Sequence, residues 1–318
     1  MSKVKYSIGI DLGGTKIAAS LVRNDGVIVD YLRTPVNSNE NNHSQIKPDN
    51  VVSKIKNLIL EINSNYPSEC SGRNFMGIGL ASAGPLNVNS GELIYPANFP
   101  GWKIVPIRDL LQKKLKEIKI NKRVNFQNDA MASALAEGWI GGAKKLNSYA
   151  VVTLGTGIGT GVIVNGQPCQ THGVGSEFGH LVINSGSFAK KDKNFKSMTV
   201  EGIASGPALV KKARSMGFKG HSVEELIKDD KKKYHKIYNE MSWALACLCF
   251  NLSIGIGLEG IFISGGLLNI KKYFYKDIVT NYKYLINQFN SSFECPIRIA
   301  NTKNKAGVIG AAYLPYIK

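Results

Sequence analysis

The sequence contains two glycine- and threonine-rich loops whose composition suits them to binding phosphate groups. The first is Asp11-Leu-Gly-Gly-Thr-Lys16 and the second is Leu154-Gly-Thr-Gly-Ile-Gly-Thr-Gly161. Each loop lies between two β-rich runs, and each second run ends in a hairpin turn, at Asp25-Gly26 and at Asn165-Gly166. Glycine lets backbone N–H groups approach a ligand closely, and threonine adds a hydroxyl donor. Two such loops facing each other would hold a polyphosphate from both sides, as an ATP-dependent phosphotransferase requires.

Two other glycine motifs do not fit these loops. A P-loop requires G-x-x-x-x-G-K-[ST], which neither loop contains. A dinucleotide-binding G-x-G-x-x-G opens a helix, whereas residues 155–161 continue into Val162-Ile-Val164, which resembles a strand. The alternative to phosphate binding is a pair of tight turns without a ligand. The repetition of the strand–loop–strand pattern in one chain favours phosphate binding.

The composition is that of a globular protein with room for two domains. The chain has 318 residues, 43% of them hydrophobic, and no apolar run approaches the length of a membrane span. No signal peptide precedes the first strand, and the five cysteines form no regular disulfide framework, so we expect a reduced, cytoplasmic setting and no membrane partner. The net charge of +17 is scattered in short basic clusters without a recognition motif, which predicts solvated surface and no specific nucleic-acid partner.

The hydrophobic pattern predicts an α/β protein with two related halves. Each half begins with a β-meander, over 6–34 and from 149, and continues with alternating helices and strands. Strands are expected over 75–80, 124–126, 258–263 and 296–300, and helices over 50–65, 107–115, 129–139, 205–216, 222–228, 234–254 and 305–316. We predict a small N-terminal lobe (1–125), a large C-terminal lobe (126–304) and a ligand-binding cleft between them. The closing helix (305–318) is expected to pack back on the first lobe.

Seven blocks taken together resemble the ROK family of sugar kinases. They follow the family's order over essentially the whole chain: Asp11-Leu-Gly-Gly-Thr-Lys16, Asn98-Phe-Pro-Gly-Trp102, Asn128-Asp129, Leu154-Gly-Thr-Gly-Ile-Gly-Thr-Gly161, Glu177-Phe-Gly-His180, Glu201-x-x-x-Ser205-Gly206 and Ser264-Gly-Gly266. Each block alone is a weak signal, but their combination is specific. The resemblance implies two ribonuclease-H-like lobes of the actin/hexokinase/Hsp70 type around an interdomain cleft.

The resemblance implies a catalytic role for Asp129 and a metal-binding role for Asp11. Asp129 would take the proton from the attacking sugar hydroxyl, since transfer to phosphate needs a positioned base. An N-cap before an alanine-rich helix is the alternative interpretation of Asn128-Asp129, and both can hold at once. Asp11 would hold Mg²⁺ through water, because hard cations prefer oxygen ligands. Its alternative is a strand-end residue bonded to the amides of Gly13 and Gly14.

The remaining implied site residues form an ATP group and a sugar group. The ATP group comprises Gly13, Gly14, Thr15, Lys16, Gly155, Thr156 and Gly157 at the phosphates and Gly265 and Gly266 at the adenosine. Lys16 is equally compatible with an exposed place on the strand. The sugar group, which would hydrogen-bond hydroxyls, comprises Gly84, Asn98, Asn128, Asp129, Glu177, His180 and Glu201.

The sequence departs from the family pattern between His180 and Glu201. Most relatives carry a zinc-binding Cys-x-Cys-Gly-x-x-Gly-Cys cluster there, whereas residues 181–200 contain no cysteine. A structural zinc ion needs about four soft or imidazole ligands. We therefore expect no zinc, and a loop that other contacts must order.

The activity implied by the resemblance is Mg²⁺- and ATP-dependent phosphorylation of a hexose, with glucose converted to glucose 6-phosphate. Kinases of N-acetylmannosamine, N-acetylglucosamine or fructose are alternatives, and bulky Phe99 and Trp102 are expected to disfavour an acetamide group. A ROK transcriptional repressor is disfavoured because only ten residues precede Asp11. The retained Asp129 argues against a sugar-binding protein without catalysis. A homodimer is compatible with the sequence, which does not determine the oligomeric state.

Overall fold

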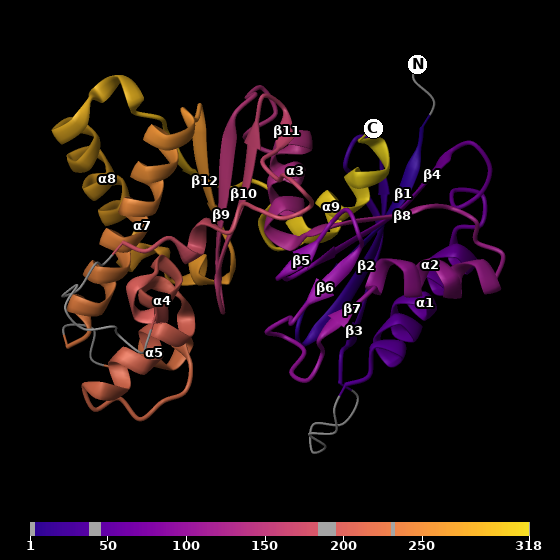
Figure 1. Ribbon diagram of the computed structural model, residues 1–318, viewed down its shortest axis with the longest axis horizontal. Coiled ribbons are helices and arrows are strands. Elements are labelled where there is room, and N and C mark those ends of the chain that lie inside the picture. The colour runs from indigo at the N-terminus through magenta and orange to yellow at the C-terminus, as the bar shows by residue number, and fades with distance from the viewer. Residues whose placement is uncertain (1–3, 38–45, 184–194, 230–232, 318) are drawn as a thin grey trace. The chain divides into compact units, whose positions relative to one another are not determined.

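The computed structural model describes residues 4–37, 46–183, 195–229 and 233–317. They form two compact units, each built around a five-stranded sheet (Figure 1). The first unit comprises Met1–Lys145, Cys169–Gly175 and Asn304–Lys318, and the second comprises Leu146–Pro168 and Ser176–Lys303.

The sheet of the first unit has the strand order β3-β2-β1-β4-β8. β1 (Tyr6–Leu12), β2 (Lys16–Arg23) and β3 (Ile28–Pro35) form an antiparallel meander. β4 (Phe75–Ser82) and β8 (Val124–Asn128) continue the sheet in parallel with β1. β1 and β4 are buried along nearly their whole length, because helices cover both faces of the sheet.

Helices α1 (Pro48–Asn65) and α2 (Ile107–Glu117) lie on one face of this sheet (Figure 1). Proline suits the first turn of α1 because its fixed φ is helical and its missing N–H would have no partner there. The buried side chains of α1 recur at helical spacing and join the strands in the main core: Val51, Val52, Ile55, Leu58, Ile59 and Ile62.

Helices α3 (Asp129–Ile140) and α9 (Ala306–Tyr313) pack against each other on the opposite face. The contact is made by glycine and alanine. A Cβ atom at Gly9 of β1 or Gly79 of β4 would overlap the backbone of α9, and one at Gly310 would overlap the backbone of α3. Backbone therefore meets backbone at a distance that only glycine permits.

The boundary of the first unit differs from the expected one at residue 125. β8 pairs with β4, and α3 packs on α9, so the first unit continues to Lys145. The sequence pattern located these elements but carried no information on which sheet each one joins.

The second unit repeats the topology of the first. Its strand order is β11-β10-β9-β12-β13. β9 (Tyr149–Leu154), β10 (Ile158–Val164) and β11 (Gln167–Pro168) are antiparallel, and β12 (Gly260–Ser264) and β13 (Ile297–Ile299) run parallel to β9. Three antiparallel strands followed by two parallel strands is the arrangement expected of a ribonuclease-H-like lobe.

Three helices of the second unit lie where the sequence pattern predicts them: α5 (Gly206–Ser215), α6 (Val223–Leu226) and α7 (His235–Ile256). The described residues also form α4 (Val200–Ala204), which the pattern does not predict, and α8 (Tyr275–Phe289). Short 3-10 helices include η1 (Phe178–His180) and η3 (Gly266–Tyr273). Residues 184–194, most of the loop expected to bind no zinc, lie outside the described residues, so the absence of zinc stays a prediction.

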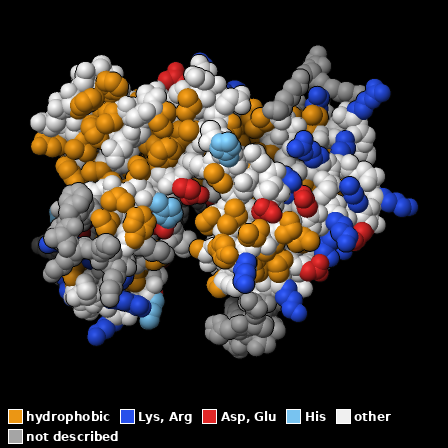
Figure 2. Space-filling model, viewed as in Figure 1, with side chains coloured by type: hydrophobic (Ala, Val, Ile, Leu, Met, Phe, Trp, Pro, Cys, Tyr) orange, Lys and Arg blue, Asp and Glu red, His pale blue; other side chains and the backbone are white. Residues whose placement is uncertain are grey.

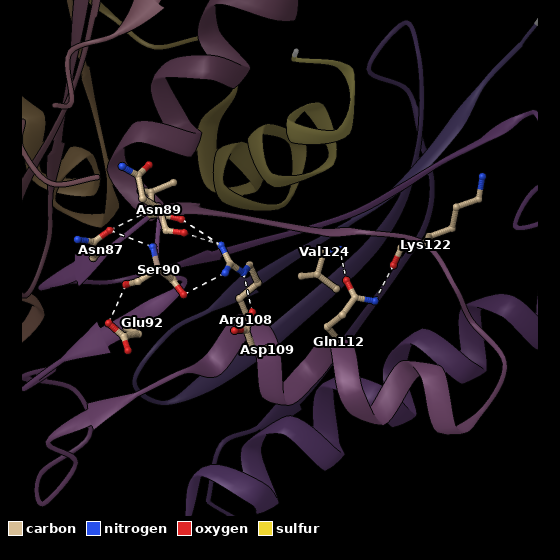
Figure 3. Close-up of polar contacts among 10 residues, drawn as sticks. Asn87, Asn89, Ser90, Glu92, Arg108, Asp109, Gln112, Lys122 and Val124 are labelled. Atoms are coloured by element: carbon tan, nitrogen blue, oxygen red, sulfur yellow. Dashed lines mark hydrogen bonds and ion pairs between the residues drawn. The ribbon is translucent and has the colours of Figure 1, made fainter. Parts of the chain in front are cut away.

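A small sheet that the sequence pattern does not predict is joined to α2 by hydrogen bonds. Its strands, β5 (Leu86–Asn87), β6 (Glu92–Ile94) and β7 (Ile104–Val105), are too short to show a period. The Arg108 guanidinium donates to the carbonyls of Asn89 and Ser90, at 3.0 Å each, and a Cβ atom at Gly91 would lie 2.6 Å from it (Figure 3).

The next turn of α2 holds the start of β8. The Gln112 amide accepts from the N–H of Val124 at 2.8 Å and donates to the carbonyl of Lys122 at 2.9 Å (Figure 3). One helix therefore fixes both the small sheet, which carries Asn98 between β6 and β7, and the strand that leads to Asp129.

On the face shown in Figure 2, most of the Lys and Arg side chains lie over the first unit, singly or in small groups, some of them beside Asp or Glu. This distribution is typical of solvated surface. In the described part of the chain, no helix is both long and apolar enough to cross a membrane.

We expect Gly79→Ala to destabilise the first unit by at least about 2 kcal/mol, because the added methyl group overlaps the carbonyl of Ala311 and must push α9 off the sheet. Gly255→Ala in α7 is the matched control, since a Cβ there meets no atom within 4 Å and alanine is the better helix former. Denaturant unfolding followed by tryptophan fluorescence measures both. An unchanged midpoint for Gly79→Ala would contradict the close packing of α9.

Candidate active site

The carboxyl ends of three parallel strands gather the first group of site residues at one edge of the first sheet. Leu12 of β1 pairs with Ser82 of β4, which pairs with Asn128 of β8. Asp11, Gly84 and Asp129 therefore lie within two residues of this aligned row. Such an edge is where open α/β sheets bind ligands, because loops there are free to vary while the strands hold them in register.

The sequence left open whether Asn128-Asp129 caps a helix or supplies a base, and the structure gives the cap to Asn128. Asn128 is the N-cap of α3: its side-chain oxygen accepts from the N–H groups of Ala130 at 2.9 Å and Met131 at 3.2 Å. Asp129 is the first residue of the helix, and its carboxylate accepts from the Ala130 N–H at 2.8 Å. Asn128 thus satisfies the helix end and leaves one Asp129 oxygen outside that bond.

The Asp11 and Asp129 carboxyl groups are close enough to repel each other. Burial first, and then the charge of Asp129, raise the pKa of Asp11 to about 7, although the nearby Lys16 ammonium opposes the shift. Burial also raises the pKa of Asp129, while hydrogen bonds from backbone N–H groups lower it. Two partly buried carboxylates in one place favour a bound cation, because a divalent ion removes both the repulsion and the cost of burial.

Gly307 in the first turn of α9 completes the surroundings of Asp11. A Cβ atom at this position would lie 2.5 Å from the Asp11 carboxylate, so only glycine leaves the carboxylate where it is. The positive end of a helix dipole stabilises a nearby anion. Nothing in the sequence around residue 307 marked it as part of the site.

The first glycine loop is a tight turn that contacts Asn98. The Gly13 N–H donates to the carbonyl of Lys16 at 3.1 Å, and the Thr15 carbonyl accepts from Val36 at 2.9 Å. A Cβ atom at Gly14 would lie 3.0 Å from the Asn98 side chain. A residue expected at the phosphates and one expected at the sugar therefore touch.

Two other segments of the second unit contact the second glycine loop. The Gly155 N–H donates to Gly157 at 3.0 Å, and the Gly155 carbonyl accepts from the Gly206 N–H at 2.9 Å. Gly265, with φ of 98°, lies so close to the end of β9 that a Cβ would overlap the backbone of Leu154. The sides of Gly155 and Gly266 where a Cβ would stand are open, which leaves room for a ligand.

Glu177, His180 and Glu201 gather around the start of β10. The Thr160 hydroxyl of β10 accepts from the Phe178 N–H at 3.0 Å and donates to the carbonyl of Ser176. This pair of bonds fixes η1, which carries exposed Glu177 and His180 at its ends. The Glu201 carboxylate accepts from the Ile158 N–H at 3.0 Å, so it lies on the second glycine loop.

Phe99 and Trp102 were expected to limit the room for an acetamide group on the sugar, but they lie in the core. Their rings stack at 4.4 Å and are buried in the main core of the first unit. The Trp102 indole N–H donates to the carbonyl of Ile46. Both rings anchor the segment that carries Asn98, and their bulk is no evidence against an acetamide group on the substrate.

We expect Asp11→Asn to stabilise the protein at pH 8 in the absence of Mg²⁺. The pKa of Asp11, raised from 3.8 to about 7, means that the folded state loses stability as pH rises through this range, because the carboxyl group must ionise while buried. The asparagine variant does not incur this loss, which amounts to at most about 4 kcal/mol.

Thermal unfolding at pH 5 and pH 8 with a chelator tests this expectation. The gain in Tm of the variant over wild type should be larger at pH 8. Asp25→Asn, at an exposed surface ion pair with Arg23, is the control and should show no such gain. An Asp11→Asn variant less stable than wild type at pH 8 would contradict the repulsion between the two carboxylates.

The chain matches the model of the ROK family over residues 7–316. A glucokinase of Thermotoga maritima is 34% identical over 184 residues, which are 58% of this chain and about half (52%) of that relative. A glucokinase of Halalkalibacterium halodurans is 25% identical, with 98% of this chain and 94% of the relative covered. An N-acetylmannosamine kinase of Haemophilus influenzae is 26% identical, with 96% and 94% covered.

Solved structures share the fold. A ROK hexokinase from Thermus thermophilus is 24% identical with a TM-score of 0.78 and 98% of both chains covered. A ROK family glucokinase from Streptomyces griseus, in complex with glucose and AMPPNP, is 20% identical with a TM-score of 0.72, and 97% of this chain and 98% of that chain are covered. These likenesses confirm the predicted fold of the actin/hexokinase type. The family model spans nearly the whole length, and the chain therefore belongs to the ROK family.

Proposed function

We propose that this protein transfers the γ-phosphoryl group of ATP to the primary hydroxyl of a hexose, and that the hexose is glucose. The observation that carries the proposal is the pair of partly buried carboxylates, Asp11 and Asp129, at a sheet edge that also carries the first glycine loop. Membership of the ROK family makes a hexose kinase the activity that this pair fits.

Asp129 acts as the general base. Its raised pKa brings its proton affinity closer to that of a working base at neutral pH, and its position at the first turn of α3 fixes the carboxylate. As the sugar oxygen attacks phosphorus, the proton of the hydroxyl moves to the carboxylate of Asp129. The Asn128 cap keeps this carboxylate free of the task of ending the helix.

Asp11 would hold Mg²⁺ through water. Mg²⁺ usually takes one or two carboxylates and completes its shell with water and phosphate oxygens, and the carboxylate of Asp11 is a suitable partner for it. When bound, the metal neutralises charge on the transferring phosphoryl group. Lys16, close enough to affect Asp11, adds a second positive charge beside the first glycine loop.

The nucleotide and the sugar are assigned to the two residue groups set out from the sequence. Gly14 and Gly157 offer backbone N–H groups to the phosphates, while Gly13 and Gly155 close the two turns with their own N–H groups, and the turn at Gly265 receives the adenosine. The sugar is assigned to Gly84, Asn98, Asn128, Glu177, His180 and Glu201, whose donors and acceptors suit hydroxyl groups. AMPPNP and glucose in the complex of the Streptomyces griseus relative support these two ligand classes.

The choice of glucose rests on relatives. Two glucokinases, one of them 34% identical over its matched part, support glucose, while an N-acetylmannosamine kinase at 26% supports an N-acetylated substrate. The core position of Phe99 and Trp102 removes the steric argument that the sequence offered. Glucose therefore stands as the proposed substrate on similarity alone.

Replacing the proposed base tests the chemistry. We expect Asp129→Asn to lower kcat by about 10²–10⁴-fold while the KM for the sugar changes little, because the lost proton acceptor matters mainly in the transition state. Asparagine can still accept from the Ala130 N–H, and it removes a buried charge, so folding should be retained. A coupled assay of ADP release measures kcat, and circular dichroism checks the fold. A variant with near wild-type kcat would exclude Asp129 as the base.

A panel of sugars tests the substrate. With ATP and Mg²⁺, kcat/KM is expected to be highest for glucose and lower for N-acetylmannosamine, N-acetylglucosamine and fructose. An N-acetylated sugar that exceeds glucose tenfold would overturn the glucose assignment and leave the kinase assignment intact. Failure of every sugar to stimulate ADP release would overturn the kinase assignment itself.

A further inference from the structure

The carboxylate of Glu201 lies on the second glycine loop. Its Oε2 atom accepts a hydrogen bond from the Ile158 N–H at 3.0 Å. A Cβ atom at Gly157 would lie 2.6 Å from the same oxygen. The side chain is therefore seated directly against the turn, in the space that any other residue at position 157 would fill.

The backbone around Glu201 is held firmly enough to fix this contact. Buried Thr199 is the N-cap of α4, and its hydroxyl accepts from the Gly202 N–H at 3.1 Å. The Val200 N–H donates to the Leu181 carbonyl at 3.1 Å. Because hydrogen bonds hold the backbone on both sides of Glu201, the fold determines where its carboxylate lies.

The residues that follow α4 contact the same loop at a second place. The Gly206 N–H, at the start of α5, donates to the Gly155 carbonyl at 2.9 Å. Residues 201–206 thus contact the loop twice, at Gly155 and at Ile158. Within the loop, Gly155 and Gly157 share a hydrogen bond of 3.0 Å.

The result is a turn whose two middle N–H groups are left for a ligand. Among the backbone hydrogen bonds of the described residues, none uses the N–H of Thr156 or of Gly157. Thr156 is exposed, and the Cβ position of Gly155 is open. Neighbouring N–H groups presented in this way form a binding place for phosphate oxygens.

We propose that Glu201 is a positioning residue for the nucleotide: its carboxylate holds the Gly155–Ile158 turn in the shape that binds phosphate. This inference rests on the proposed function, since it requires a nucleotide at this loop. It adds a role to the sugar contact assigned to Glu201, which its second oxygen remains able to make.

The proposal separates the hydrogen bond of Glu201 from its charge. A negative charge beside a phosphate site opposes binding, so the benefit comes from accepting the Ile158 N–H. Glutamine has a side-chain oxygen that can accept the same bond without the charge. Glu201→Gln should therefore bind nucleotide as well as wild type, or better, whereas Glu201→Ala should not.

The test is the affinity for the non-hydrolysable analogue AMPPNP with Mg²⁺, measured by calorimetry in the absence of sugar. We expect Kd to rise at least tenfold in Glu201→Ala and to stay within threefold of wild type, or below it, in Glu201→Gln. Glu224→Ala is the matched control. Glu224 is also the second residue of a short helix, after a hydroxyl N-cap and a valine, but it is exposed and should leave Kd unchanged.

Gly157→Ala supplies a second route that leaves Glu201 in place. The added Cβ would push the Glu201 carboxylate, which is the flexible end of that side chain, away from the turn. The Kd for AMPPNP should therefore rise as in Glu201→Ala. In the double variant the two effects should not add, because both remove one contact. This variant also keeps the proposal testable if Glu201→Ala fails to fold.

Three results overturn the inference. They are an unchanged Kd in folded Glu201→Ala, a Glu201→Gln variant as weak as Glu201→Ala, and additive losses in the double variant. If wild type phosphorylates glucose while one of these occurs, only the inference fails. If wild type binds no AMPPNP, the proposed function fails with it.

Discussion

The structure of the first unit depends on how closely α9 approaches its neighbours. Glycine at positions 9 and 79 lets the backbone of this helix lie directly on β1 and β4, and Gly310 lets it lie directly on α3. Asp11 is the next-to-last residue of β1 and Asp129 begins α3, and α9 packs on both elements, so it helps the sheet to hold the two carboxyl groups in place. The same approach brings Gly307 against Asp11. A helix formed by the last residues of the chain thereby shapes a site whose acids lie more than a hundred residues earlier.

This arrangement trades stability for function. Two carboxylates near each other, both partly buried and both with raised pKa values, are unfavourable in the free protein. The fold tolerates them because the sheet, the Asn128 cap and α9 hold their backbone from three sides. A site of this kind is prepared for a cation and for a proton to be accepted, since either event relieves the repulsion. The repulsion in the free state would thus contribute to the affinity for the proposed cation.

Much of the fold could be predicted from the sequence, because its signals are local. The repeated meander, the helical spacing from Val51 to Ile62 and the hairpin turns depend on residues close in the chain, and the structure has elements there. Contacts between distant segments could not be predicted. The small sheet fastened by Arg108, the approach of Gly307 to Asp11 and the burial of Phe99 and Trp102 each depend on which surfaces meet. Bulky rings after Asn98 were compatible with a pocket wall or with a core, and only packing distinguished the two.

The two halves solve one problem with different chemistry. In each, a glycine loop follows the first strand of an equivalent sheet, and a polar side chain from a distant segment is seated on a glycine of that loop: Asn98 on Gly14, and Glu201 on Gly157. Both side chains belong to the group proposed to bind the sugar, and both loops belong to the group proposed to bind phosphate. If a sugar binds to either side chain as proposed, it would act on the loop beneath that side chain through one contact. The two contacts differ, since the first half uses an amide and the second a carboxylate. Coupling between ATP and the sugar would then arise within each half, at the contact between a side chain and a glycine.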